Sequence, residues 1–291
     1  MRGTWQKWVE AGAVAGLLLL GSSRTAAQYG QSSQKPPTPP AQQTDKKPPS
    51  DTLTLDTPAP PVNAEEDAAY KAFESAPMAD LNKKIQIGED FLQKYPQSRY
   101  RPLLYPVLAQ AYVHSNNVQK MQEVGEKDLE LNPNDVQTLA LMGQTIPRAM
   151  NSSTPNPQQQ LDKAEKYAKS AIEITPTLPK PETLSDEQFA AAKNITLAMA
   201  HSGLGLVFFR RGKFAEAIPE FEQAVKVDPH PEEDPVNFYV LGIANEKTSH
   251  FEDAVTAFNK CASVPGSLQA SCKGLADEAK KRAATELSAP K

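Results

Sequence analysis

Residues Leu204–Pro229 read LGLVFFRRGKFAEAIPEFEQAVKVDP, and residues Leu241–Cys261 read LGIANEKTSHFEDAVTAFNKC. Both stretches show the same order of small and large side chains, at a constant offset of 37 residues from position 204 to position 241. The matched pairs are Leu204 with Leu241, Gly205 with Gly242, Ala217 with Ala254, Phe221 with Phe258, and Ala224 with Cys261. Apolar residues in the second half of each stretch recur at three- and four-residue spacings, which predicts a helix with one apolar face. A fixed period of this kind predicts stacked helical hairpins, because each hairpin buries its apolar face only against its neighbours.

This order of residues resembles the tetratricopeptide repeat (TPR), whose period is about 34 residues. The loop at residues 230–234 accounts for the slightly longer offset found here. The glycine and alanine positions let paired helices approach closely, and Phe221 and Phe258 fill the space between successive pairs. The resemblance implies an all-α fold, a right-handed α-solenoid of about five TPR-like hairpins with a C-terminal capping helix.

The same frame extends upstream with weaker matches. We expect one repeat domain at residues 64–287, with repeats near 64–97, 102–135, 136–177, 198–231 and 235–266 and a capping helix at 268–287. In the second repeat Gly125 and Asp128 replace the usual aromatic and small residue, so we expect its second helix to pack less tightly. The capping helix is expected because a solenoid needs a polar face at its open end.

The N-terminus is typical of an export signal. Arg2 and Lys7 precede the short apolar run Ala11–Gly21, and the small residues that follow predict cleavage after Ala27. The alternative is a signal kept as a membrane anchor, but the apolar run is much shorter than the roughly 20 residues that span a bilayer. Residues 1–27 therefore predict a signal peptide and a periplasmic or secreted protein, with only transient membrane association during export.

Residues 28–63 are rich in proline and poor in apolar side chains. Such a segment buries too little apolar surface to offset the entropy of ordering, so the composition predicts a disordered Pro-rich tether. A Pro-rich segment can alternatively serve as a ligand for aromatic grooves.

Two cysteines, Cys261 and Cys272, follow the predicted signal. Disulfides persist outside the cytoplasm, so these residues are a candidate bridge between the last repeat and the capping helix. The alternative is that Cys261 is a small packing residue and Cys272 a surface one, because spacing alone does not fix geometry.

The sequence shows no convincing motif for catalysis, metal binding or nucleic-acid binding. The formal net charge of −4 argues against a nucleic-acid binder, which needs a basic face. There is no glycine-rich phosphate loop and no zincin or nucleophile-elbow motif, and two Cys with four scattered His make no zinc set. We expect no enzyme activity, catalytic residue, cofactor or metal. An unrecognised enzyme would need an Asp/His constellation that only the folded chain could assemble.

The TPR resemblance implies a concave surface that binds a protein or peptide. Its positions, carried over residue by residue, are Gln110, His114, Gln144, Arg148, Leu206, Phe209, Arg210, Val236, Tyr239, Ile243 and Glu246. Phe209 and Tyr239 are the kind of aromatic anchors that dominate binding energy. The alternative for Leu206 and Ile243 is that they only pack against neighbouring helices.

These observations favour a non-catalytic protein-binding scaffold of the bacterial cell envelope. A peptidoglycan- or carbohydrate-binding module is the alternative, because sugars stack on rings such as those of Phe209 and Tyr239. The partner is not identified by the sequence, and self-association is open. The positions that carry the family's carboxylate clamp hold Pro106, Gln110, Met199 and Gly203, so we expect no clamp for C-terminal carboxylates.

Overall fold

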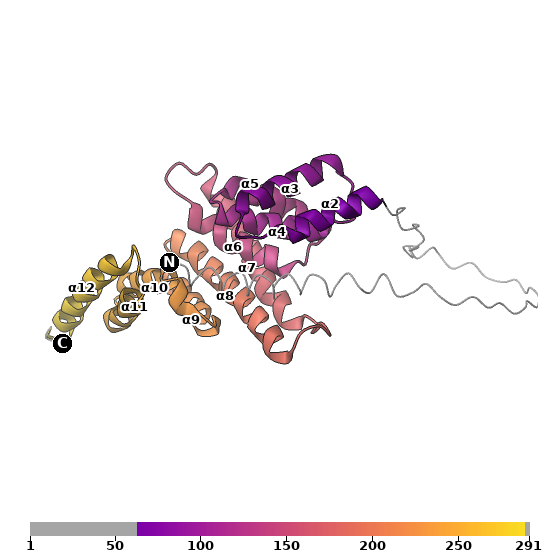
Figure 1. Ribbon diagram of the computed structural model, residues 1–291. Helices are drawn as coiled ribbons and strands as arrows, with labels where there is room; N and C mark the ends of the chain where they lie inside the picture. Colours follow the sequence, from indigo (N-terminus) through magenta and orange to yellow (C-terminus); the bar gives the residue numbers. More distant parts are fainter. Residues whose placement is uncertain (1–62, 289–291) are drawn as a thin grey trace, which may run out of the picture.

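The computed structural model describes residues 63–288, and in this part of the chain it is all-helical and builds a TPR-like solenoid (Figure 1). The predicted signal peptide and nearly all of the Pro-rich segment lie outside the described residues. The α-helices are α2 (Ala64–Ser75), α3 (Leu81–Lys94), α4 (Arg101–His114), α5 (Val118–Leu131), α6 (Val136–Ala149), α7 (Pro157–Ile174), α8 (Asp186–Arg210), α9 (Phe214–Val227), α10 (Val236–Lys247), α11 (Phe251–Ser263) and α12 (Gln269–Ser288). Short 3-10 turns, η2 (Thr175–Thr177) and η3 (Pro231–Glu233), follow α7 and precede α10.

Consecutive helices pack as hairpins arranged in two layers. Helices α4, α6, α8 and α10 contact one another in turn and form the inner layer. Helices α5, α7, α9 and α11 each pack on an inner helix, and within residues 63–288 they have no comparable contact with one another. Because the inner helices lie closer together than the outer ones, the inner layer is the concave side of the solenoid.

Glycines set the closest approaches between helices. A Cβ atom at Gly205 or Gly242 would lie 2.7 or 2.5 Å from the ring of Phe221 or Phe258, respectively. Both rings are fully buried. The glycine and phenylalanine positions that recur in the sequence are therefore contact partners within each hairpin.

In the second repeat, a methionine of α6 takes the place of the phenylalanine that fills the later hairpins. At Gly125, where the later repeats have phenylalanine, a Cβ atom would lie 2.6 Å from the sulfur of Met142 on α6. Met142 is fully buried and fills the space that the sequence analysis expected to be loosely packed. Methionine suits this role because its unbranched chain adapts to irregular gaps. Asp128, at the small position of α5, is also fully buried.

Helix α8 begins well before the repeat that was predicted to start near residue 198. Ser185 and Gln188 form a capping box, with the Ser185 hydroxyl accepting from the Gln188 amide and the Gln188 side chain accepting from the Ser185 amide. Ala192, Thr196 and Ala200 are buried at four-residue spacing, which gives this extension one packed face. The first half of α8 therefore projects beyond its hairpin with α9.

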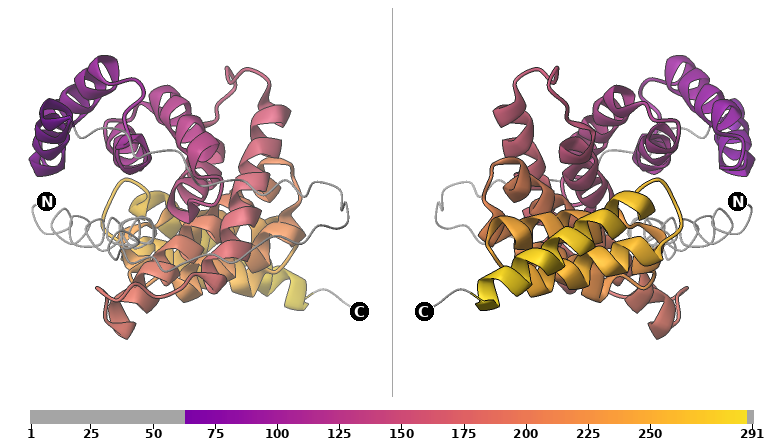
Figure 2. Two further views of the ribbon diagram at one scale, coloured as in Figure 1. Left: turned by 90° about the vertical axis from the view of Figure 1, so that its right-hand side faces the viewer. Right: turned by 90° about the vertical axis from the view of Figure 1, so that its left-hand side faces the viewer.

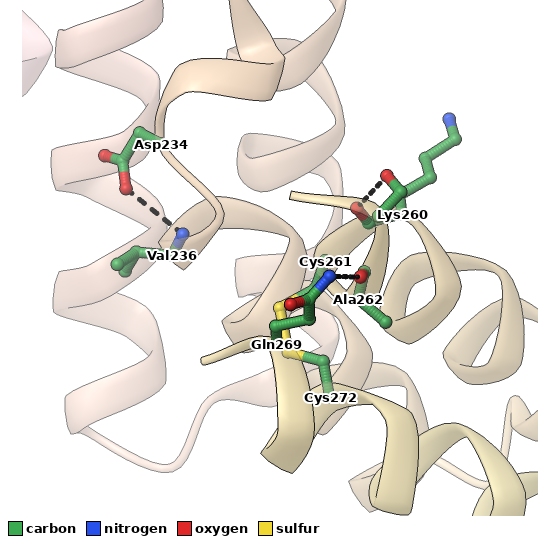
Figure 3. Close-up of a disulfide and its surroundings, with 8 residues drawn as sticks. Asp234, Val236, Lys260, Cys261, Ala262, Gln269 and Cys272 are labelled. Atoms are coloured by element: carbon green, nitrogen blue, oxygen red, sulfur yellow. Dashed lines mark hydrogen bonds between the residues drawn. A yellow bond between two sulfur atoms is a disulfide. The ribbon is translucent and has the colours of Figure 1, made fainter. Parts of the chain in front are cut away.

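The C-terminal helix α12 lies across the last hairpin (Figure 2). Ala276, Ala279 and Ala283 are buried on the inner side of α12, and its outer side is polar. A disulfide joins Cys261 of α11 to Cys272 of α12, and both residues are fully buried (Figure 3). The bond fixes α12 to the repeat that it covers.

Candidate partner-binding surface

The concave side carries an apolar group near its C-terminal end. Phe209 on α8 and Val236 and Tyr239 on α10 are half-buried and pack against one cluster. The Phe209 ring meets the Phe214 ring edge-on, with centroids 5.3 Å apart. Ile243, one turn beyond Tyr239, is half-buried and packs with it on the next cluster, which lies against α12. The structure thus brings these four predicted surface residues together.

Leu206 is only 4% exposed and lies inside the same cluster. It supports Phe209 and Tyr239 from below and is not available to a ligand. This placement matches the alternative that the sequence left open for Leu206. Ile243 keeps partial exposure, so it can contribute to a surface.

Polar residues of the predicted surface are engaged within the chain. Arg148, near the end of α6, pairs with Asp234 at 2.6 Å, and Asp234 also accepts from the Val236 amide at the start of α10. Arg210 at the end of α8 donates to the carbonyl oxygens of Pro147 (3.1 Å) and Met150 (2.9 Å). We call Arg148, Arg210 and Asp234 the clasp, because they join the ends of three successive inner helices.

Glu246 is also committed to the fold. Its carboxylate accepts from Arg282 on α12 at 2.7 Å. Gln110 and Gln144 are half-buried on α4 and α6, and His114 is exposed at the C-terminal end of α4. Three of the eleven predicted surface residues, Arg148, Arg210 and Glu246, therefore hold neighbouring elements in place.

Sequence reasoning missed two polar contacts that position this surface. Ser202 on α8 donates to Asn237 on α10 at 2.6 Å, and both residues are buried. His201 meets Glu220 of α9 at 2.7 Å. No pattern in the sequence marks these pairs, since each residue type is common at both buried and exposed positions. Asp234 lies in the loop at residues 230–234, for which the sequence indicated no contact.

Two of the four positions that correspond to a carboxylate clamp have no room for a long basic side chain. Pro106 is buried, and a side chain at Gly203 would run into the backbone of α6. The structure thus accounts for the missing basic groups at these two positions.

On the convex side, a shallow trough of about 250 Å³ lies between α9 and α11. It exists because the outer helices diverge and leave one side of α10 uncovered. Its floor includes Phe238 and Leu241, which are 7% and 8% exposed, so it presents little apolar area. Glu222 and Asp253 stand on its rim.

Within residues 63–288, no group of three or more His, Cys, Asp or Glu side chains is arranged to hold a metal ion. None of the described helices is long and apolar enough to cross a membrane.

Comparison with known families identifies the repeat. Residues 198–231 match the family model of the tetratricopeptide repeat. The chain contains a tetratricopeptide repeat. This TPR segment comprises the second half of α8, all of α9 and the turn that follows α9. Its part of α8 includes Phe209 and Arg210. No curated protein matches the sequence.

Several solved structures show a partial likeness to this chain. A thermophilic TPR protein of Thermus thermophilus is 15% identical with a TM-score of 0.45, covering 73% of this chain and 95% of that one. MamA of AMB-1 is 18% identical with a TM-score of 0.46, covering 69% and 98%. Yeast Tom70 is 16% identical with a TM-score of 0.46, covering 75% of this chain and 39% of that one.

Proposed function

We propose that this chain is a non-catalytic scaffold of the bacterial cell envelope that binds a protein partner through its concave surface. The observation that carries the proposal is the grouping of Phe209, Val236, Tyr239 and Ile243 on successive inner helices. Two rings and two β-branched side chains give a contact area with little entropy to lose on binding.

The arrangement around this group suits a binding surface. Leu206 and Phe221 support it from inside, so the aromatic rings are held before a partner arrives. The clasp fixes the spacing of α6, α8 and α10 beside it. A rigid apolar patch with a polar border binds well, because the ordering cost falls on the partner alone.

The N-terminal sequence supports the location. The predicted export signal and the predicted Pro-rich tether support a location of the repeat domain in the periplasm or outside the cell. The tether lets the domain sample partners within its reach.

Capture in cells tests the proposal. A tagged full-length chain is crosslinked in living cells, and the captured proteins are identified by mass spectrometry. We expect one reproducible partner whose yield falls about tenfold or more in the Phe209→Ala/Tyr239→Ala variant, since well-buried aromatic anchors contribute roughly 2 kcal/mol each.

The matched control is Phe189→Ala. Phe189 is a half-buried phenylalanine on the same helix as Phe209, about 30 Å away at the rise of an α-helix. Equal capture by all variants would contradict the proposal. Hydrolytic activity that co-purifies with the chain would contradict it as well.

A glycan is the second candidate ligand, favoured by the partial exposure of the Tyr239 ring. Sedimentation with purified peptidoglycan, lost in Tyr239→Ala and kept in Phe189→Ala, would support this alternative over a protein partner.

A further inference from the structure

The joint between α5 and α6 buries two carboxyl groups. Asp128, on α5, is 0% exposed, and Asp135, just before α6, is 7% exposed. Asp128 occupies the position held by Ala224 and Cys261 in the last two repeats, where both are fully buried. An acid has thus taken a place that the repeat normally gives to a small, uncharged side chain.

The hydrogen bonds of the two acids differ. One oxygen of Asp135 caps α6 by accepting from the amides of Gln137 (3.0 Å) and Thr138 (2.9 Å). One oxygen of Asp128 accepts only a long 3.5 Å contact from the side chain of Asn132. The other carboxyl oxygen of each acid is shielded from solvent and has no hydrogen bond of ordinary geometry. The Thr138 hydroxyl lies near both acids and acts to lower the pKa of each.

No cation of residues 63–288 compensates the pair. Among the described residues, neither acid forms an ion pair. From α4, the nearby titratable groups are the Tyr105 phenol and Arg101. Burial raises the pKa of Tyr105, and the charges of Glu130 and Asp128 on α5 raise it further, while Arg101 lowers it. Thr138 and Asn132 are the neutral groups that face Asp128.

Two neighbouring carboxyl groups that are shielded from water cannot both ionise without a large cost in free energy. Burial, reinforced by the charge of Asp135, raises the pKa of Asp128 to about 7. Burial raises the pKa of Asp135 as well, although its two amide hydrogen bonds act in the opposite direction. Asp128 lacks amide donors of this kind, so its carboxyl group is the one that a proton stabilises more.

We propose that Asp128 and Asp135 form a proton-binding site that closes the joint between α5 and α6, and that loss of the proton loosens this joint. The bound proton supplies the donor that the shielded oxygens lack. When a base from solvent removes it, two negative charges face each other at the start of α6 with no counter-ion.

The joint matters for the rest of the solenoid because α6 links its two halves. Toward the N-terminus it meets α5, and toward the C-terminus it carries Arg148 of the clasp and packs on α8. Loosening the α5–α6 contact therefore changes how α4, with Gln110 and His114, stands relative to the apolar group. The proton site itself does not depend on the proposed function.

Two measurements on the folded chain test the site. Carbon NMR of the aspartate side-chain carboxyls is expected to show Asp128 titrating near pH 7, about three units above an ordinary aspartate. Urea unfolding of the wild type and Asp128→Asn is then compared between about pH 5 and pH 7. The unfolding constant of the wild type, divided by that of Asp128→Asn, is expected to rise about tenfold per pH unit as pH increases toward the folded pKa, the slope for one proton. The sign follows because Asp128 is ionised in the unfolded chain over this range and keeps its proton in the folded chain.

Asp277→Asn, an exposed acid on α12, is the matched control and is expected to keep the wild-type slope. If Asp128→Asn does not fold, Asp135→Asn keeps a capping side chain and is expected to bring the Asp128 titration down toward its usual range. An Asp128 carboxyl that titrates near pH 4 in the wild type overturns the proposal. A second result would also overturn it. In that case magnesium or sodium chloride stabilises the wild type but not Asp128→Asn, and the stability of the wild type does not depend on pH, since a metal cation would then hold the pair.

Discussion

Gly203 of α8 lies directly on the backbone of Gly143 of α6. A Cβ atom at position 203 would come within 2.6 Å of both the carbonyl carbon and the carbonyl oxygen of Gly143. Backbone cannot move aside as a flexible side chain can, so this crossing fixes the spacing of α6 and α8. Two clasp residues, Arg148 and Arg210, lie at the C-terminal ends of these helices, and their contacts depend on that spacing.

Gly203→Ala is expected to destabilise the chain by about 3 kcal/mol, the upper part of the usual range for overpacking. Urea unfolding followed by circular dichroism measures this loss. Gly274→Ala on α12 is the matched control, because nothing lies within 4 Å of its Cβ position. Alanine is expected to be neutral or to stabilise there by up to about 1 kcal/mol. Equal effects of the two substitutions would show that the crossing is not tightly packed.

Opening the disulfide is expected to release α12. The bond closes a loop with a sequence separation of 11 residues, for which the chain-entropy model gives about 2–3 kcal/mol of stability. Hydrogen exchange should show loss of protection in α12 before other helices in Cys261→Ser/Cys272→Ser. A reducing agent should lower the melting temperature of the wild type and leave that of the double variant unchanged. An unchanged wild type would contradict the structural role of the bond.

The Arg148–Asp234 pair should contribute modestly to stability. Both side chains keep some exposure, 35% and 27%, so screening by solvent limits the pair to about 1 kcal/mol or less. A double-mutant cycle with Arg148→Ala and Asp234→Ala isolates this coupling. We expect it to shrink at high salt. A coupling indistinguishable from zero at low salt would mean that the clasp rests on Arg210 alone.

Glu165 should make the chain sensitive to acid. Lys169 and Arg211 hold the pKa of Glu165 below its usual value of 4.5. A lowered folded pKa stabilises the fold above the unfolded value, and this stabilisation is lost as pH falls through the folded pKa. Glu165→Gln is therefore expected to cost up to about 1 kcal/mol at neutral pH and less in acid.

Unfolding of Glu165→Gln at about pH 7 and about pH 3 checks this sign. Glu278→Gln, an exposed acid on α12, is the control and should show no such convergence with the wild type. A Glu165→Gln penalty that grows in acid would refute the assignment.

Much of the fold could be predicted from the sequence because the residues that recur from repeat to repeat contact each other within one hairpin. Gly205 with Phe221, and Gly242 with Phe258, are contacts within one hairpin, so both members recur at the same offset. Local helix periodicity gave the remaining helices. The N-terminal extension of α8 was missed, because its packed face uses Ala192 and Thr196, which are too small or too polar to produce a strong apolar pattern.

The surface was less predictable than the fold. Position in the repeat identifies the side of the helix a residue faces, but not what reaches it from elsewhere. Arg148 meets Asp234, which is 86 residues away in sequence, and Glu246 meets Arg282 of the capping helix. The burial of Asp128 was similarly hidden, because the sequence marked it only as a departure from a small residue.

The most direct test of the proposed function places a photo-crosslinking amino acid at position 239 of the full chain in living cells. If the concave surface binds a protein, light should produce one discrete adduct of defined mass at this position. The same group at position 189 should give none. Adducts of equal yield at both positions, or none at position 239 while the chain is abundant and folded, would contradict a partner-binding role for the concave surface.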